Sequence, residues 1–85
     1  QKRRDQVMSI TVLYFASLRE AAGKSSEQLP LPDSLSALYE ELNGHYRFGF
    51  DQHALRVAVN DRFAAWQSPV RDGDTVAFIP PVSGG

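Results

Sequence analysis

The stretch Thr75-Val76-Ala77-Phe78-Ile79-Pro80-Pro81-Val82-Ser83-Gly84-Gly85 decides the fold and the function that we expect. Its first five residues are β-branched or apolar and predict a strand. Pro80 and Pro81 each hold φ at about −65° and lack a backbone N–H, so the sheet ladder stops there. Residues 80–85 can then project roughly 20 Å from the body, at about 3.3 Å per residue. Because Gly84 and Gly85 carry no Cβ, this flexible tail could bring a terminal carboxylate into a channel too narrow for side chains.

The residues at the start of the chain predict two strands and a short helix. Residues 9–15 are rich in β-branched and aromatic residues, with apolar residues on both faces, which is typical of a central strand. Ser17 and Glu20 form a predicted capping box at the start of a short helix that Gly23 ends. Residues 27–31 alternate weakly and end in Pro30 and Pro32, so they can form only an edge strand.

A longer helix follows, with Ser34 as its predicted N-cap. Its apolar residues have the i, i+3, i+4, i+7 spacing of a helix that packs across a sheet; they are Leu35, Leu38, Tyr39 and Leu42. We expect Asn43-Gly44 to end this helix and residues 45–54 to form a loop. Residues 56–60 then predict the next strand.

The remaining residues complete a mixed sheet. Asn60-Asp61 predicts a two-residue hairpin turn that returns through residues 63–65, and Trp66 is expected to pack against the body. The order strand, short helix, strand, long helix and several strands predicts an α+β fold of the ubiquitin-like β-grasp kind, in which a mixed sheet packs on one main helix. We expect the first and last strands to lie together at its centre. The predicted domain covers residues 8–79, and the tail covers residues 80–85.

Composition restricts the chemistry that this chain can perform by itself. The sequence contains no cysteine, which excludes a disulfide, a thiolate metal site and a cysteine nucleophile. His45 and His53 are the only histidines and have no carboxylate cluster beside them. We therefore expect surface roles for both, and no metal or cofactor bound by this chain. No apolar stretch is long enough for a membrane span and no signal-peptide pattern occurs, which favours the cytoplasm.

Residues 1–7 differ in character from the rest of the chain. Lys2, Arg3 and Arg4 lie close together, and Met8 directly precedes the first alternating pattern. We expect Met8 to be the natural start and residues 1–7 to be a cloning remnant or an alternative leader. Without them the formal net charge changes from −1 to −3. An acidic body argues against nucleic-acid binding and suits a basic protein partner.

Three segments of the sequence together resemble one known protein family. They are residues 12–23, which begin Val12-Leu13-Tyr14-Phe15; the strand Val57-Ala58-Val59-Asn60; and residues 72–85, with the ending Phe78-Ile79-Pro80-Pro81-Val82-Ser83-Gly84-Gly85. In these segments the sequence resembles the small, sulfur-carrying subunit of molybdopterin synthase, and the match covers nearly all of residues 8–85. The family often has an acidic residue where this chain has Thr75. Residues 1–7 have no counterpart.

The resemblance implies that the chemistry falls on Gly85. A ubiquitin-activating-type adenylating enzyme would use ATP to turn its carboxylate into an acyl-adenylate. Sulfur from a donor protein would then displace AMP and leave a thiocarboxylate. The tail would enter the large synthase subunit and give its sulfur to cyclic pyranopterin monophosphate, and two such transfers would build the molybdopterin dithiolene. The family also implies a heterotetramer with two large subunits at its centre.

The other residues of the ending receive supporting roles from the same resemblance. Gly84 would provide passage into the partner, and the reach and direction of the tail would be set by Pro80, Pro81, Val82 and Ser83. Phe78 is interpreted either as docking surface or as sheet core. A thiocarboxylate is ionised and nucleophilic at neutral pH, so it needs no base from this chain, which would not catalyse turnover alone. The sequence accordingly has no Ser-His-Asp grouping and no phosphate-binding glycine-rich loop.

Three other interpretations stay open. A sulfur carrier for thiazole synthesis shares the fold, ending and activation, although that family is usually shorter and generally lacks the Phe-Ile-Pro-Pro run. A ubiquitin-like modifier would join its terminal carboxylate to a lysine by an isopeptide bond. A β-grasp binding module with an inert tail would keep its activity when Gly85 is deleted, whereas either carrier would lose all activity with its fold intact.

Overall fold

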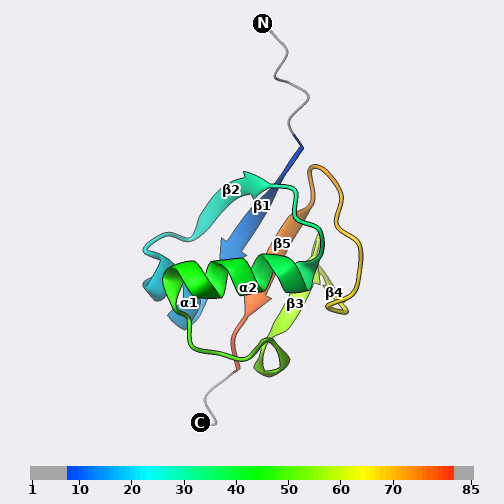
Figure 1. Cartoon of the computed structure of the whole chain (residues 1–85). Coiled ribbons are helices and arrows are strands. Elements are labelled where there is room, and N and C mark those ends of the chain that lie inside the picture. Colours follow the sequence, from blue (N-terminus) through cyan, green and yellow to red (C-terminus); the bar gives the residue numbers. More distant parts are fainter. Residues whose placement is uncertain (1–7, 82–85) are drawn as a thin grey trace, which may run out of the picture.

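The computed structural model describes residues 8–81 (Figure 1). Within that range, five strands form one sheet in the order β2-β1-β5-β3-β4. The elements are β1 (Ser9–Tyr14), α1 (Ala16–Ala22), β2 (Ser26–Pro30), α2 (Leu35–Tyr46), the 3₁₀ helix η2 (Gln52–Ala54), β3 (Arg56–Val59), β4 (Arg62–Ala64) and β5 (Thr75–Ile79). Figure 1 shows α2 crossing in front of this sheet, so the predicted α+β architecture with one main helix is confirmed.

The last strand, β5, lies in the middle of the sheet. It pairs in parallel with β1, where Phe78 lies beside Tyr14, and antiparallel with β3, where Phe78 lies beside Val57. β2 pairs antiparallel with β1 at one edge, and β4 pairs antiparallel with β3 at the other. The prediction that the first and last strands lie together at the centre is confirmed. The tail therefore leaves from a strand with neighbours on both sides.

The core forms between α2 and one face of the sheet. In β1 the side chains of Ile10, Val12 and Tyr14 are buried, and in β5 those of Val76 and Phe78 are buried. The predicted helical stripe faces them and is also buried; it consists of Leu35, Leu38, Tyr39 and Leu42. Full burial of such a side chain stabilises the fold by about 1.5–3 kcal/mol relative to exposure. Alternation in the strands and helical periodicity in α2 thus place the apolar groups at one interface.

The start of α1 differs from the prediction. The helix begins at Ala16, its N-cap is Phe15, and no side chain caps it. The backbone N–H of Leu18 donates to the carbonyl oxygen of Phe15 at 3.0 Å. The first turn is therefore closed directly behind β1, which brings Leu18 into the core at 0% exposure. The capping box with Ser17 as N-cap is wrong because core packing of Leu18 sets the start, while Gly23 (φ 76°) ends the helix as predicted.

The end of α2 also differs from the prediction. Asn43-Gly44 does not end the helix, which continues to Tyr46. Arg47 then adopts a left-handed conformation with φ 60°. The two added residues bring the ring of Tyr46 to 5.9 Å from that of Tyr14 and 5.6 Å from that of Phe48. These tertiary contacts outweigh the local preference of an Asn-Gly pair for a helix end.

Other local predictions are confirmed. Ser34 caps α2, since its hydroxyl oxygen accepts a hydrogen bond from the backbone N–H of Ala37 at 3.0 Å. Asn60 and Asp61 have φ of 54° and 72° and join β3 to β4 as a two-residue hairpin. The predicted loop over residues 45–54 is confirmed only for residues 47–51. Its ends are wrong, because His45 and Tyr46 continue α2 and residues 52–54 form η2. Within residues 8–81, neither helix is long and apolar enough to cross a membrane.

Candidate functional site

The base of the tail follows directly on the central strand. β5 ends at Ile79, after which Pro80 is buried and Pro81 is exposed. Pro80 therefore belongs to the packed domain rather than to the projecting arm that we expected, because its ring is covered by the body. Pro81 is the first exposed residue of the ending. The other predicted tail residues lie outside the described range; they are Val82, Ser83, Gly84 and Gly85.

Phe78 is a core residue. Its side chain is 0% exposed, and its ring lies 5.5 Å from that of Tyr39 and 5.9 Å from that of Trp66, nearly parallel to the latter at 11°. Side chains alternate along a strand, and this one points toward α2. The interpretation of Phe78 as docking surface is therefore wrong, and its interpretation as sheet core is correct. The same contacts confirm that Trp66 packs against the body.

The opposite face of the sheet carries a row of apolar residues. Leu13 of β1 pairs with Ala77 of β5, Ala77 pairs with Ala58 of β3, and Ala58 pairs with Phe63 of β4. Phe63 is 66% exposed. We call this row, together with Phe15 and Ile79 beside it, the open-face patch. It reaches from β4 across β5, the strand that leads into the tail.

The open-face patch was missed as a functional surface by sequence reasoning. The signal was present, because residues 9–15 have apolar side chains on both faces. We interpreted that pattern as burial on both sides, yet Phe15 is 45% exposed. At the other end of the patch the guanidinium group of Arg56 lies 5.1 Å from the ring centroid of Phe63. A partly exposed apolar surface with exposed aromatic rings at its ends and a cation at its rim is typical of a protein contact.

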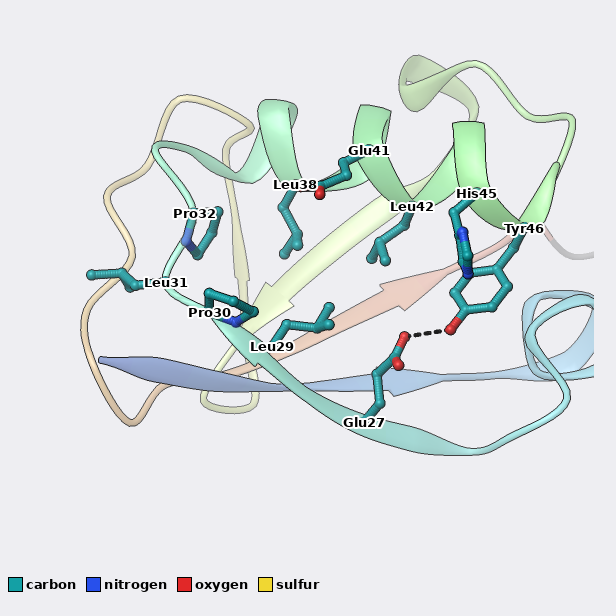
Figure 2. A pocket seen from close by; sticks show the side chains of 10 residues that line it. All are labelled: Glu27, Leu29, Pro30, Leu31, Pro32, Leu38, Glu41, Leu42, His45 and Tyr46. Carbon is teal, nitrogen blue, oxygen red and sulfur yellow. Dashed lines mark hydrogen bonds between the residues drawn. The ribbon is translucent and has the colours of Figure 1, made fainter. Parts of the chain in front are cut away.

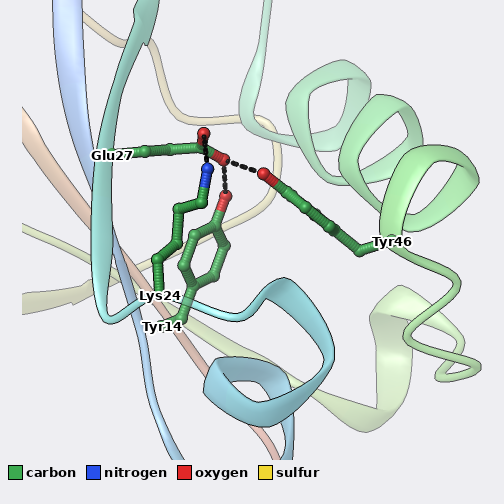
Figure 3. A network of polar contacts seen from close by, with 4 residues as sticks. All are labelled: Tyr14, Lys24, Glu27 and Tyr46. Carbon is green, nitrogen blue, oxygen red and sulfur yellow. Dashed lines mark hydrogen bonds and ion pairs between the residues drawn. The ribbon is translucent and has the colours of Figure 1, made fainter.

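A cluster of polar side chains joins β1 and β2 to α2 (Figure 3). One carboxylate oxygen of Glu27 accepts hydrogen bonds from the hydroxyl of Tyr14 and, at 2.8 Å, from that of Tyr46. The other accepts from the Lys24 ammonium group at 3.2 Å. Since Tyr14 lies on β1, Glu27 on β2 and Tyr46 on α2, this one carboxylate joins three elements. Sequence reasoning missed this cluster, because 13 and 19 residues separate Glu27 from the two tyrosines.

The cluster fixes the charge state of its members. Burial raises the pKa of the Tyr14 hydroxyl, and its hydrogen bond to Glu27 raises that pKa further. Burial by itself would raise the pKa of Glu27, but hydrogen bonds from Tyr14, Tyr46 and Lys24 outweigh it and hold that pKa below its ordinary value. At neutral pH Glu27 is thus an ionised carboxylate with three donors. It acts as a clamp between β1, β2 and α2.

Histidines and acidic residues do not gather into a metal site in the described part of the chain. His45 on α2 and His53 in η2 are both exposed, as predicted. Within residues 8–81, no three His, Asp or Glu side chains lie close enough together to hold a metal ion. The features that remain for function are the anchored base of the tail and the open-face patch beside it.

Comparison with known proteins assigns the family. Residues 12–85 match the model of the ThiS family. The chain belongs to the ThiS family. A relative in Escherichia coli K12, named molybdopterin synthase sulfur carrier subunit, is 32% identical over 80 residues, which cover 89% of this chain and 99% of the relative. The family match includes the base of the tail, the residues after it and the whole of the open-face patch.

Solved structures of similar proteins confirm the ubiquitin-like β-grasp fold. A putative molybdopterin converting factor subunit 1 from Pyrococcus furiosus is 31% identical, with a TM-score of 0.72 over 88% of this chain and 99% of its own. The small archaeal modifier SAMP1 from Haloferax volcanii is 26% identical, with a TM-score of 0.74 over 91% of this chain and 99% of its own. A complex of subunits 1 and 2 of the molybdopterin-converting factor from Helicobacter pylori contains a chain that is 23% identical, with a TM-score of 0.66 over 92% and 100%. That last likeness shows the fold alone.

Proposed function

We propose that this ThiS-family protein is the sulfur-carrier subunit of a molybdopterin synthase. The observation that carries the proposal is its 32% identity to the Escherichia coli sulfur carrier subunit across 99% of that protein. The family match also runs to residue 85, so it includes the glycine that would carry the sulfur. The anchored tail base is consistent with this role, because a central strand holds the start of the reactive arm.

The proposed chemistry takes place at the carboxylate of Gly85. A carboxylate oxygen attacks the α-phosphorus of ATP on an adenylating partner enzyme, and pyrophosphate leaves. A persulfide sulfur of a donor protein then attacks the acyl carbon, and AMP leaves. A thiol breaks the S–S bond of the resulting acyl disulfide, so that a disulfide forms on the donor and a thiocarboxylate remains on Gly85. In the large synthase subunit this sulfur attacks a carbon of cyclic pyranopterin monophosphate and forms a thioester. Water then hydrolyses the thioester, which leaves the sulfur on the pterin and regenerates the carboxylate on Gly85. Two transfers supply the two sulfur atoms of the dithiolene.

The described domain supports this role by what its residues can do. Glu27, the most engaged carboxylate, is held by three donors and serves as a clamp. A thiocarboxylate is already an ionised nucleophile, so the carrier needs to present it rather than to activate it. ATP belongs to the activating partner in this proposal. The large subunit supplies the groups that bind the pterin and protonate intermediates.

The open-face patch is the proposed docking surface for these partners. Phe15 and Phe63 are exposed aromatic residues, a type that often dominates protein contacts. The patch crosses β5, so a partner seated on it also lies beside the exit of the tail. Docking there would direct Pro81 and the residues after it into the partner's active site. We propose the large subunit as this partner, in a heterotetramer with two large subunits at the centre.

The experiment that tests the proposal measures intact protein mass. The protein is incubated with ATP, a sulfur source and the matching adenylating enzyme, and the same is done with a variant that lacks Gly85. We expect a mass gain equal to the exchange of one oxygen atom for one sulfur atom, only in the full-length chain. If no gain occurs under conditions that charge a known carrier, the carrier function is wrong.

A ubiquitin-like modifier is the second candidate, favoured by the likeness to SAMP1 at 26% identity. In that case the acyl carbon of Gly85 would form an amide with a lysine Nζ of another protein, and AMP would leave. Mass spectrometry of tryptic digests after activation distinguishes the two functions. A remnant of this chain on lysine side chains supports the modifier, whereas a sulfur-bearing terminus without such remnants supports the carrier.

A further inference from the structure

A groove between the edge strand β2 and the helix α2 lies apart from the tail and from the open-face patch. Its volume is about 440 Å³. Figure 2 shows side chains of both elements pointing into it, with Leu29 from β2 facing Leu38 and Leu42 from α2. Glu41 and His45 lie on the helix side of its rim. Its floor is thus apolar, and its rim contains ionisable groups.

The backbone of β2 leaves hydrogen-bonding groups directed away from the sheet. The carbonyl oxygen of Ser25 accepts a hydrogen bond from the N–H of Tyr14 in β1, and the N–H of Leu31 donates to the carbonyl oxygen of Met8, just before β1. Bonded pairs alternate along an antiparallel ladder, so the residues turned toward β1 are the odd-numbered ones. Ser26 and Gln28 therefore direct both N–H and C=O outward, and Pro30 directs its C=O only. Among the described strands β2 has one neighbour, so this outer edge can accept another strand.

We propose that this groove binds an extended segment of a partner protein, which adds to the edge of β2 as a short strand. Alternate side chains of an added strand point to the same face of the sheet as Leu29 and enter the groove against Leu38 and Leu42. The chemistry of the floor selects apolar residues at these alternate positions. The edge strand supplies the hydrogen bonds that a helix or a small apolar molecule would leave unused.

The charges at the rim select a basic residue in the same segment. Glu41 is exposed on α2 at the mouth of the groove, beside the exposed Glu40. Glu27, at the end nearer Tyr46, is already paired with Lys24. A Lys or Arg of the bound segment therefore meets Glu41 as its nearest acidic group at the rim. In the bound segment this basic residue lies two positions after an apolar residue that fills the groove, so that both side chains point to the same face.

The prolines of this edge limit the length of the bound segment. Pro30 has no N–H to donate, and Pro32 occupies one end of the groove. The added ladder is thus confined to the neighbourhood of Ser26 and Gln28, which predicts weak, reversible binding. The groove lies on the helix side of the sheet, so the segment and a partner on the open-face patch can bind at the same time. The groove would give the carrier a second contact, independent of sulfur transfer.

The test uses the full chain labelled with ¹⁵N and the peptide acetyl-Val-Thr-Val-Thr-Lys-Thr-amide. This peptide places two valines and the lysine on one face of a strand. We expect saturable chemical-shift changes at millimolar peptide, centred on the amides of Ser26, Gln28, Leu38 and Leu42. Absence of saturable changes, or changes centred on β3 and β4, would overturn the proposal. If the chemical shifts of the β2 amides change with protein concentration when no peptide is present, the groove binds a second copy of this chain and the proposal is overturned.

Two variants test the backbone and charge contributions separately. Gln28→Pro removes one outward N–H and should abolish binding, whereas Gln28→Thr keeps that N–H and should bind as the parent does. Glu41→Lys changes an exposed residue and should weaken binding of the lysine peptide about two- to five-fold. The same variant should improve binding of a peptide with glutamate in place of lysine. Unchanged affinities in Glu41→Lys would overturn the charge assignment even if Gln28→Pro does not fold.

Discussion

Replacing Phe78 with alanine tests whether the strand before the tail is held by the core. Phe78 is 0% exposed and packs against Tyr39 and Trp66. Removing a fully buried phenylalanine ring costs about 3–5 kcal/mol, from lost burial and the cavity left behind. A small domain has a free energy of unfolding of about 5–15 kcal/mol, so the loss is a large share of it. The midpoint of thermal unfolding should fall by roughly 12 °C or more.

The matched control is Phe63→Ala on the neighbouring strand β4. Phe63 is 66% exposed, so about a third of the burial is lost, and the contact with Arg56 adds little. We expect a cost of about 1 kcal/mol. Urea unfolding followed by far-ultraviolet circular dichroism, and by the fluorescence of Trp66, the only tryptophan, gives both values. Equal costs for the two variants, or a cost below about 1 kcal/mol for Phe78→Ala, would refute the placement of Phe78 in the core.

Three further predictions concern the clamp, a turn and the docking surface. Glu27→Gln should lower the free energy of unfolding by about 2 kcal/mol at neutral pH. Because the pKa of Glu27 in the folded protein lies below its ordinary value, this difference from the parent should shrink as the pH falls through that pKa. A difference that does not depend on pH in urea titrations would contradict the clamp. Gly23→Ala should lower the free energy of unfolding by about 1 kcal/mol because Gly23 has φ 76°, whereas Gly44→Ala within α2 should raise it by a similar amount. Thermal unfolding midpoints that shift in the same direction for both variants would contradict this assignment of the backbone. Phe15→Asp should weaken binding to the large subunit at least tenfold in calorimetry with little change in the unfolding midpoint, and unchanged affinity would exclude the open-face patch as the docking surface.

Periodicity and turn chemistry were sufficient to predict most of the fold. Alternation gave the strands, the leucine stripe gave α2, and Asn60-Asp61 gave the hairpin, because each depends on residues close together in sequence. The two helix ends that were wrong depend on contacts between distant residues. Leu18 is drawn into the core at the start of α1, and Tyr46 reaches Tyr14 at the end of α2. Local preferences of Ser17 and Asn43-Gly44 were weaker than those contacts.

In the candidate site, too, features that depend on neighbouring residues were predicted and features that depend on the fold were not. That the ending delivers a carboxylate was predicted from its own residues, since a glycine pair after two prolines needs no distant partner to be noticed. The sulfur chemistry of Gly85 was implied by the family resemblance. The surface beside it was not predicted, because whether an apolar strand face is buried or open depends on what covers it. Phe78 and Ile79 are adjacent apolar residues, yet only the three-dimensional structure assigns the first to the core and the second to the open-face patch. The groove beside β2 was equally hidden, since it requires the placement of α2.

We propose above all that sulfur on Gly85 is delivered to a pterin precursor. The most direct measurement is a single-turnover reaction of thiocarboxylated protein with the large synthase subunit and cyclic pyranopterin monophosphate, followed by intact mass. We expect the carrier to return to the mass of its carboxylate form while molybdopterin forms, with two carriers consumed for each dithiolene. A carrier that keeps its sulfur in the presence of an active large subunit, or that loses it without dithiolene formation, would contradict the proposed function.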